Sequence, residues 1–318
     1  MDKLSTLRPP PSTQDDKPMF LELTGIHEPS AIQQLEDGRF LVVEDEKQYP
    51  FSLVTLGADG SVGSTPLRLD SLAADDAFAK LDDLEGIALD RAGFIYAVTS
   101  HSRDDDGDEK KSRDKLVRFR IEGDRAVAPK VVKGIKPALT AAHPVLAAAA
   151  AIRDVKSDAG LNIEALEMSP DQQRLLIGFR SPLLDGRAII ASVDNPSAMF
   201  ESGEPPRIAA TLTTLDLGGD GIRGMSFIPA LDGWLLISGP VARQQVQFRL
   251  WFWSGQADRP ARPVTVTGLP GFEHAEGVSP ALIDGRQQII FVSDDGNRKQ
   301  GLSAHYLLLE PAQLKIAP

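Results

Sequence analysis

The sequence has no cysteine, no long hydrophobic run and no excess of basic residues. Without cysteine, neither a disulfide nor a thiolate metal site can form. A formal net charge of −11 argues against nucleic acid or an anionic membrane as a partner, because both require a basic surface. No stretch reaches the ~20 apolar residues of a membrane span, and no apolar run follows the first basic residues. We therefore expect a cytoplasmic protein; a piece of a longer secreted protein is the alternative.

What the sequence does contain is an ordinary globular composition. Hydrophobic residues make up 42% of its 318 residues and charged residues 25%, which is enough to bury a large core. The first 17 residues combine three consecutive prolines with scattered charges. We expect a disordered tail over residues 1–17 and a single domain over residues 18–318.

Five stretches of the sequence share one pattern. Each has a charged residue, a small residue, a short apolar segment, a polar turn rich in Asp and Gly, and four to six consecutive apolar residues. The stretches begin at Glu28, Glu85, Glu164, Arg223 and Glu276. The pattern predicts a β-hairpin whose second strand is buried on both faces.

Each hairpin is followed by further strand candidates, such as "FSLVTLG" and "TPLRLD" after the first. The last unit ends after its third candidate, and "KPMFLELTG" near the N-terminus can supply its fourth strand. We therefore predict an all-β fold, a five-bladed β-propeller of four-stranded blades closed by an N-terminal strand. The longest spacing, between the second and third hairpins, contains "PALTAAHPVLAAAAAIRDVKSDAG" and predicts one helical insertion near residues 136–159.

In a propeller, the first strand of each blade begins at the same end of the central channel at which the second strand ends. The first residues of the hairpins would therefore meet there, and four of them are carboxylates: Glu28, Glu85, Glu164 and Glu276. Such carboxylates repel one another. A divalent cation of the Ca²⁺ type could bind between them, Arg223 could pair with its neighbours, or some carboxylates could stay protonated. Glutamates that only cap backbone N–H groups are a further alternative.

The ends of the second strands would add polar side chains at the same end of the channel. They are Asp45, His101, Arg103, Arg180, Asp294 and Asp295. Arg103, Arg180 and Arg223 around a cation suit a small anionic ligand, and histidine titrates near neutral pH. For each arginine alone an ordinary salt bridge is the alternative, and for His101 a structural hydrogen bond.

The motifs "LEGIALD", "GFRSPLLDGRA", "LGGDGIRG" and "AEGV" resemble the bacterial family known as domain of unknown function three-six-one-six. That resemblance implies a propeller and no established activity. The chain is more loosely similar to phytase-like esterase propellers and calcium-activated apyrases. The apyrase similarity implies Glu85, Glu164 and Glu276 as metal ligands, with Glu28 or Ser30. Arg223 departs from the apyrase pattern.

We therefore expect a monomeric propeller with a central divalent-cation site that binds a small anionic ligand. The hypothetical activity is metal-assisted hydrolysis of a phosphate ester or phosphoanhydride, with Glu164 and His101 as candidate catalytic residues. A non-enzymatic binding or scaffold propeller is one alternative, and a lactonase-type esterase is another.

Overall fold

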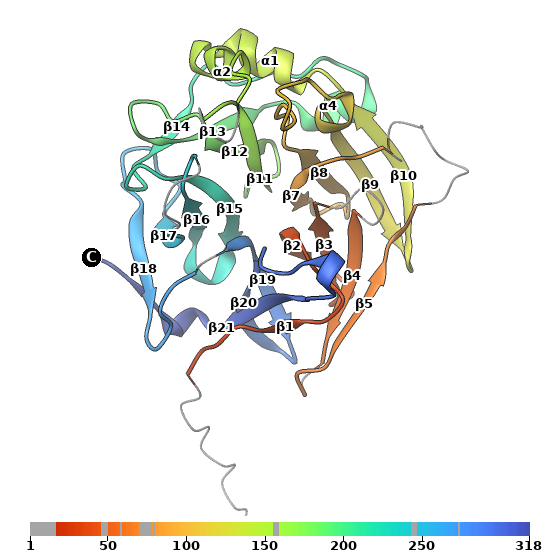
Figure 1. Cartoon of the computed structure of the whole chain (residues 1–318), viewed down its shortest axis with the longest axis vertical. Helices are drawn as coiled ribbons and strands as arrows, with labels where there is room; N and C mark the ends of the chain where they lie inside the picture. Colours follow the sequence, from red (N-terminus) through yellow and green to blue (C-terminus); the bar gives the residue numbers. More distant parts are fainter. Residues whose placement is uncertain are drawn as a thin grey trace, which may run out of the picture.

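Five β-sheets stand radially around a central channel in the computed structural model (Figure 1). The structure describes residues 17–45, 50–57, 59–69, 78, 80–154, 159–242, 247–272 and 274–318. The expected disordered tail lies outside the described residues, except for Lys17. The prediction of an all-β five-bladed propeller is confirmed.

Within each blade, antiparallel strands follow one another from the channel outward. The first blade consists of β2 (Pro29–Gln34), β3 (Phe40–Glu44), β4 (Phe51–Leu56) and β5 (Val62–Pro66). The second consists of β7 (Leu84–Leu89), β8 (Ile95–Thr99), β9 (Leu116–Glu122) and β10 (Arg125–Val132). The third consists of β11 (Asn162–Met168), β12 (Leu175–Ser181), β13 (Ala188–Val193) and β14 (Thr213–Leu215).

The fifth blade closes the ring with a strand from the other end of the chain. The fourth blade consists of β15 (Gly221–Ile228), β16 (Gly233–Gly239), β17 (Arg249–Trp253) and β18 (Arg262–Val266). The fifth consists of β19 (Ala275–Ile283), β20 (Arg286–Ser293), β21 (Ala304–Leu309) and the N-terminal β1 (Leu21–Leu23). Leu21 pairs with Tyr306 in antiparallel register, so the predicted closure is confirmed.

Two blades carry a short fifth strand that the sequence pattern did not predict. β6 (Arg68–Leu69) adds to β10 in parallel, and β22 (Leu314–Ile316) adds to the outer edge of β18. The chain therefore continues past the third strand of its last repeat and returns to the fourth blade, where Leu314 is buried. Both additions cover edges that would otherwise leave backbone groups unpaired.

The predicted helical insertion lies between the second and third blades. Its described part contains two helices, α1 (Ile135–Ala142) and α2 (Pro144–Ala150), and residues 155–158 of the predicted range lie outside the described residues. A third described helix, α4 (Pro196–Glu201), follows β13. Short 3₁₀ helices occupy Lys111–Arg113, Pro229–Leu231, Arg298–Gln300 and Pro311–Gln313.

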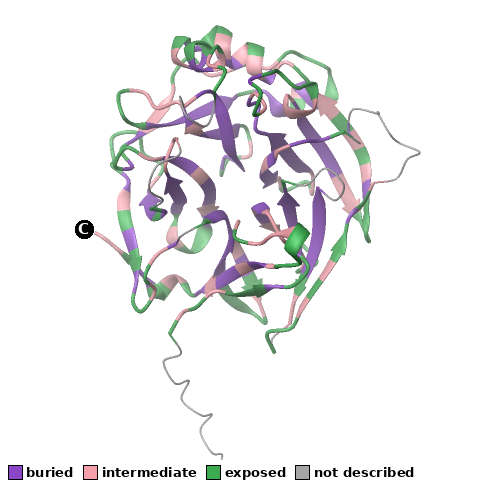
Figure 2. Cartoon of the chain, viewed as in Figure 1, coloured by how far each residue is buried: buried purple, intermediate pink, exposed green. Residues whose placement is uncertain are grey.

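The core lies between neighbouring blades. Buried residues concentrate on the inner strands, and the exposed ones on the outermost strands and loops (Figure 2). Every residue of β3 and β8 is buried, as the continuous apolar runs predicted. The aromatic rings of Phe51, Phe78 and Phe119 pack together between the first two blades. This packing fixes the blades relative to one another and so fixes the residues at the channel mouth.

Candidate functional site

A β-bulge opens the innermost strand of every blade. The pairing with the second strand skips one residue at the same place in all five blades. The skipped residues are Ser30, Glu85, Glu164, Arg223 and Glu276. A bulge turns a side chain away from the plane of its sheet. All five side chains line one cavity of about 640 Å³ at the mouth of the channel.

The bulges show that the first repeat was matched to the other four at the wrong residue. Ser30, and not Glu28, occupies the position equivalent to Glu85. Glu28 lies just before β2, where its carbonyl oxygen accepts a hydrogen bond from the Asp45 backbone N–H at 3.1 Å. Short matches such as "EPSA" and "EGIA" are compatible with both alignments, because each has a small residue near the glutamate. The ring formed by the five bulged residues therefore has three carboxylates and one arginine.

A small residue follows each bulged residue, and close packing explains why. These residues are Ala31, Gly86, Ala165, Gly224 and Gly277. A Cβ atom added to Gly224 would lie 1.9 Å from the Glu276 carbonyl oxygen of the next blade. The innermost strands thus approach so closely that larger side chains are excluded.

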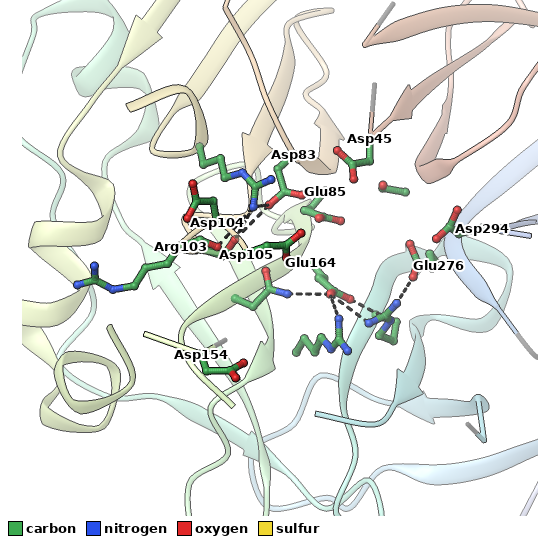
Figure 3. A pocket seen from close by; sticks show the side chains of 16 residues that line it. Asp45, Asp83, Glu85, Arg103, Asp104, Asp105, Asp154, Glu164, Glu276 and Asp294 are labelled. Carbon is green, nitrogen blue, oxygen red and sulfur yellow. Dashed lines mark hydrogen bonds and ion pairs between the residues drawn. The ribbon is translucent and has the colours of Figure 1, made fainter. Parts of the chain in front are cut away.

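One side of the cavity, which we call the arginine half, consists of Glu164, Arg180, Arg223 and Glu276. Arg223 Nε lies 2.9 Å from Glu164 Oε2, and Arg223 Nη2 donates a hydrogen bond to Glu276 Oε1. Arg180 Nη1 lies 3.2 Å from Glu164 Oε1. The pairing of β11 with β12 passes over Arg180, which explains why this side chain also leaves its sheet. Figure 3 shows these contacts as dashed lines.

The glutamates of the arginine half are deeply buried. Burial raises the pKa of Glu164 to about 7, although Arg223 and Arg180 oppose the rise. Burial likewise raises the pKa of Glu276 to about 7 against the attraction of Arg223. Both glutamates therefore titrate close to neutral pH, and each has an arginine partner.

The carboxylates at the mouth that lie outside the arginine half are Asp45, Asp83, Glu85 and Asp294, which we call the acidic half; Asp294 borders on Glu276 (Figure 3). Glu85 is half-buried and forms no hydrogen bond or ion pair with any residue that the structure describes. Burial and the carboxylates of Asp83, Glu164, Glu276 and Asp45 all raise its pKa well above the usual value. Desolvation also raises the pKa values of Asp45 and Asp294 to about 6, with Asp83 and Glu28, respectively, adding to the rise.

Asp83 is the one member of the acidic half with firm partners. Its Oδ2 accepts hydrogen bonds from Ser100 Oγ and Ser102 Oγ, and Arg113 Nη1 lies 3.2 Å away. The residue has a left-handed backbone with φ of 63°, which is uncommon outside glycine. These contacts fix the carboxylate beside Glu85 and Asp45, where it strengthens their mutual repulsion.

A loop and the helical insertion form the outer wall of the cavity. Arg103 donates hydrogen bonds to the carbonyl oxygens of Ala150 at 3.3 Å and Gly107 at 3.1 Å, and it also lies 3.4 Å from Glu109. The wall adds three further carboxylates to the lining: Asp104, Asp105 and Asp154. Arg103 therefore joins the loop to α2.

Not every residue expected at the mouth lines the cavity. His101 is buried: Nδ1 lies 2.8 Å from the Thr99 carbonyl oxygen and Nε2 lies 3.1 Å from Asp114 Oδ1. Burial lowers its pKa, and Asp114 partly opposes this effect. Asp295 pairs with His305 at 2.8 Å. His101, Asp295 and Glu28 are not among the lining residues, whereas the other expected residues are.

Several residues that line the cavity were not predicted from the sequence. They include Ser30, which was only an alternative, and Asp83, Ser102, Arg113, Asn162 and Asp154. Asp83 precedes Glu85 by two residues, and Asn162 has the same spacing from Glu164. A search for polar side chains two residues before each strand-one glutamate would have found both. Arg113 and Asp154 come from loops and have no such pattern.

The lining has only oxygen donors suited to a cation, since carboxylates and hydroxyls prefer hard ions such as Ca²⁺ or Mg²⁺. Nine carboxylates face four arginines in it, an excess of five negative charges when all are ionised. Within the described part of the chain, no three His, Asp or Glu residues are grouped closely enough to hold a metal ion by themselves. None of the described helices is long and apolar enough to cross a membrane.

Fold and cavity together define a five-bladed β-propeller with a predominantly acidic pocket at one end of its channel. The chain belongs to the family described as Protein of unknown function (DUF3616), whose model matches residues 135–307. The predicted family membership is thereby confirmed. No curated protein matches the chain in sequence.

Three solved structures are similar to this chain in shape at low sequence identity. A putative oxidoreductase (glucose dehydrogenase) from Thermus thermophilus is 16% identical, with a TM-score of 0.46 over 92% of this chain and 100% of its own. The PQQ-bound aldose sugar dehydrogenase of Streptomyces coelicolor is 15% identical, with a TM-score of 0.42 over 94% and 99%. The periplasmic gluconolactonase of Pseudomonas aeruginosa is 11% identical, with a TM-score of 0.37 over 91% and 78%.

Proposed function

We propose that the protein binds a divalent cation of the Ca²⁺ type in the acidic half of the cavity, and through it a small anionic ligand. The observation that carries the proposal is the environment of Glu85. Its carboxyl group has no partner among the described residues, and four other carboxylates raise its pKa. A cation would replace this repulsion by attraction.

Glu85, Asp45 and Asp294 are the residues that would hold the cation, and they come from three blades that are neighbours in the ring. No hydrogen bond or ion pair with a described residue engages their side chains. Because these carboxylates are not gathered closely enough to surround an ion, water and ligand oxygens would complete its six to eight positions. The bound cation would therefore also attract an anionic ligand.

Arg180 is the residue that would bind the other end of this ligand. Its Nε donates to the Pro240 carbonyl oxygen at 3.2 Å and its Nη1 to Glu164, but Nη2 has no partner among the described residues. Its side chain keeps 20% of its surface exposed. Arg223, by contrast, uses all three nitrogens for Glu164 and Glu276.

Calorimetric titration of the full chain with Ca²⁺ after treatment with a chelator tests the proposal. We expect one equivalent of Ca²⁺ to bind and to raise the melting temperature, since a ligand stabilises the state that binds it. Glu85→Gln should weaken Ca²⁺ binding at least about tenfold, because it removes a charge at the centre of the site.

The matched control is Glu22→Gln, which changes an exposed glutamate of β1 far from the cavity. It should bind Ca²⁺ like the unmodified protein. Binding that is absent in the unmodified protein, or equal in the Glu85 and Glu22 variants, would contradict the proposal. In that case the carboxyl groups of the acidic half would be protonated or structural.

Hydrolysis of an ester in the bound ligand is a second candidate function. The observation that favours it is the pKa of about 7 of Glu164, because a general acid or base works best when it titrates near the working pH. Glu164, which is not one of the residues that would hold the cation, would move the proton, and Arg180 would stabilise negative charge on the reacting group. A bound cation would supply polarisation of the ester oxygen.

Model substrates separate hydrolysis from binding alone. A hydrolase should turn over bis(p-nitrophenyl) phosphate, p-nitrophenyl phosphate or a simple lactone, and should lose this activity with a chelator or Glu85→Gln. Phosphate chemistry predicts competitive inhibition by inorganic phosphate, to which a lactonase should be insensitive. Turnover that survives both treatments would contradict this mechanism.

A further inference from the structure

One residue that lines the cavity has a buried hydrogen-bond acceptor with no partner among the described residues. Asn162 begins β11 and lines the cavity, and only 8% of its surface is exposed. Its Nδ2 donates to Glu164 Oε1 at 3.0 Å, but its Oδ1 has no hydrogen-bond partner among the described residues. Buried acceptors are nearly always satisfied, since an unmade hydrogen bond costs free energy. A donor on a ligand would satisfy this one.

The orientation of the Asn162 amide is determined by Glu164. The reverse orientation would place the amide oxygen against Glu164 Oε1, so that two acceptors would face each other. The same carboxylate oxygen also accepts from Arg180 Nη1 at 3.2 Å and from Arg223 Nη1 at 3.1 Å. Glu164 therefore holds the Asn162 amide group beside Arg180, because both side chains donate to the same carboxylate oxygen.

From this juxtaposition we infer that the ligand is a small hydroxylated anion, such as a sugar acid or a sugar phosphate. A hydroxyl group of the ligand donates to Asn162 Oδ1, and its anionic group accepts from Arg180 Nη2. An ammonium group would also satisfy Oδ1, but a hydroxyl group does so without adding a positive charge beside Arg180 and Arg223.

The size of the cavity agrees with such a ligand. Its volume of about 640 Å³ exceeds what a hydrated ion needs and lies in the range of small-molecule sites. This inference rests on the proposed function in one respect, namely that the ligand is anionic. Its new content is that the ligand also has a hydroxyl group and that Asn162 recognises this group. Asn162 is thus a specificity-determining residue.

Calorimetry with four probes at constant free Ca²⁺ tests the inference on the full chain. Gluconate and glucose 6-phosphate have hydroxyl and anionic groups, hexanoate has only the anion, and sorbitol has only hydroxyls. We expect gluconate, glucose 6-phosphate or both to bind at least about tenfold more tightly than hexanoate and sorbitol. The preferred anion distinguishes a sugar acid from a sugar phosphate.

Asn162→Ala should weaken binding of the preferred probe about tenfold and leave hexanoate binding unchanged. The matched control is Asn195→Ala. Asn195 is equally buried but satisfied at both ends, because Nδ2 donates to the Pro205 carbonyl oxygen and Oδ1 accepts from the Arg207 backbone N–H. This variant should melt at a lower temperature and keep its affinity for the probe.

The inference is overturned if hexanoate binds as tightly as the hydroxylated anions, if Asn162→Ala has no effect, or if no hydroxylated anion binds. Repeating the titrations in a chelator separates this result from the fate of the cation site. Gluconate binding that depends on Asn162 but not on Ca²⁺ would support the inference and contradict the proposed cation. Ca²⁺ binding without preference for a hydroxylated anion would support the proposed cation site and contradict the inference about the hydroxyl group.

Discussion

Arg223 Nε lies 2.9 Å from Glu164 Oε2, although the two residues belong to the innermost strands of different blades. The same guanidinium group reaches Glu276 in the following blade. One arginine thus links three blades around the channel. Arg223 occupies the ring position at which three other blades have a glutamate. Its positive charge therefore offsets the negative charge of the neighbouring Glu164 and Glu276.

Removal of Arg223 should destabilise the protein strongly. Arg223→Met leaves the buried Glu276 without its arginine partner and Glu164 with Arg180 alone, and breaking a buried ion pair from one side costs about 3–5 kcal/mol. Urea denaturation at pH 8 measures the loss. The loss should be smaller at pH 5, because the glutamates can then be protonated.

The control for this variant is Arg249→Met. Arg249 is 46% exposed and lies 3.9 Å from Asp220, so its loss should cost no more than about 0.5 kcal/mol. Similar losses for both arginines would mean that Arg223 does not hold the blades together through its charge.

The glycine after Arg223 should be equally sensitive. In Gly224→Ala the new Cβ would lie 1.9 Å from the Glu276 backbone oxygen, and backbone cannot move aside cheaply. We expect the variant to be insoluble or to lose about 3 kcal/mol of its free energy of unfolding, the upper end of what overpacking typically costs, because the clash is with backbone. Gly63→Ala in β5 is the control, since no atom lies within 4 Å of its added Cβ and its φ is not positive. Normal stability of Gly224→Ala would contradict the close approach of the blades.

The architecture was predictable from sequence because it depends on long apolar runs and on their repetition. Strands such as β3 and β8 are buried on both faces and therefore leave a continuous apolar signal. The short edge strands β6 and β22 pair for only two or three residues and leave no pattern. Their existence depends on where a distant segment returns, which local sequence does not encode.

The candidate site was predictable only as far as strand ends determine it. Glu85, Glu164, Arg223 and Glu276 follow from the repeat. The repeat does not determine the orientation of a side chain beyond the end of a strand, because that orientation depends on single backbone angles. His101 has φ of 56° and is buried beside Asp114, although a regular strand end would have directed it to the mouth.

Replacement of Glu85 should have opposite effects on stability and on cation binding. Without a cation, Glu85→Gln removes a charge whose strongest electrostatic neighbours are other carboxylates, so the free energy of unfolding should rise at pH 8. Most substitutions in a buried region do the reverse. Chemical denaturation in a chelator measures the effect. A lower stability would mean that Glu85 has a stabilising partner in solution.

The carboxyl groups at the mouth should make the protein less stable as the pH rises. The folded-state pKa is about 7 for Glu164 and Glu276 and about 6 for Asp45 and Asp294, whereas unfolded carboxyl groups titrate near pH ~4. Between these values the folded state holds more protons than the unfolded state. The stabilisation is therefore complete below about pH 4 for these groups and is lost as the pH passes through 6 to 7.

Urea denaturation at pH 5, 6, 7 and 8 in a chelator should therefore show the free energy of unfolding falling by about 2 kcal/mol or more, since each proton difference contributes about 1.4 kcal/mol per pH unit. Ca²⁺ should reduce the fall, because a cation takes over the role of the protons at Glu85, Asp45 and Asp294. The double variant Glu85→Gln, Asp294→Asn should show a smaller fall and no response to Ca²⁺. Stability that rises from pH 5 to pH 8 in the chelator would mean that the carboxylates are stabilised in their charged form without any added ion.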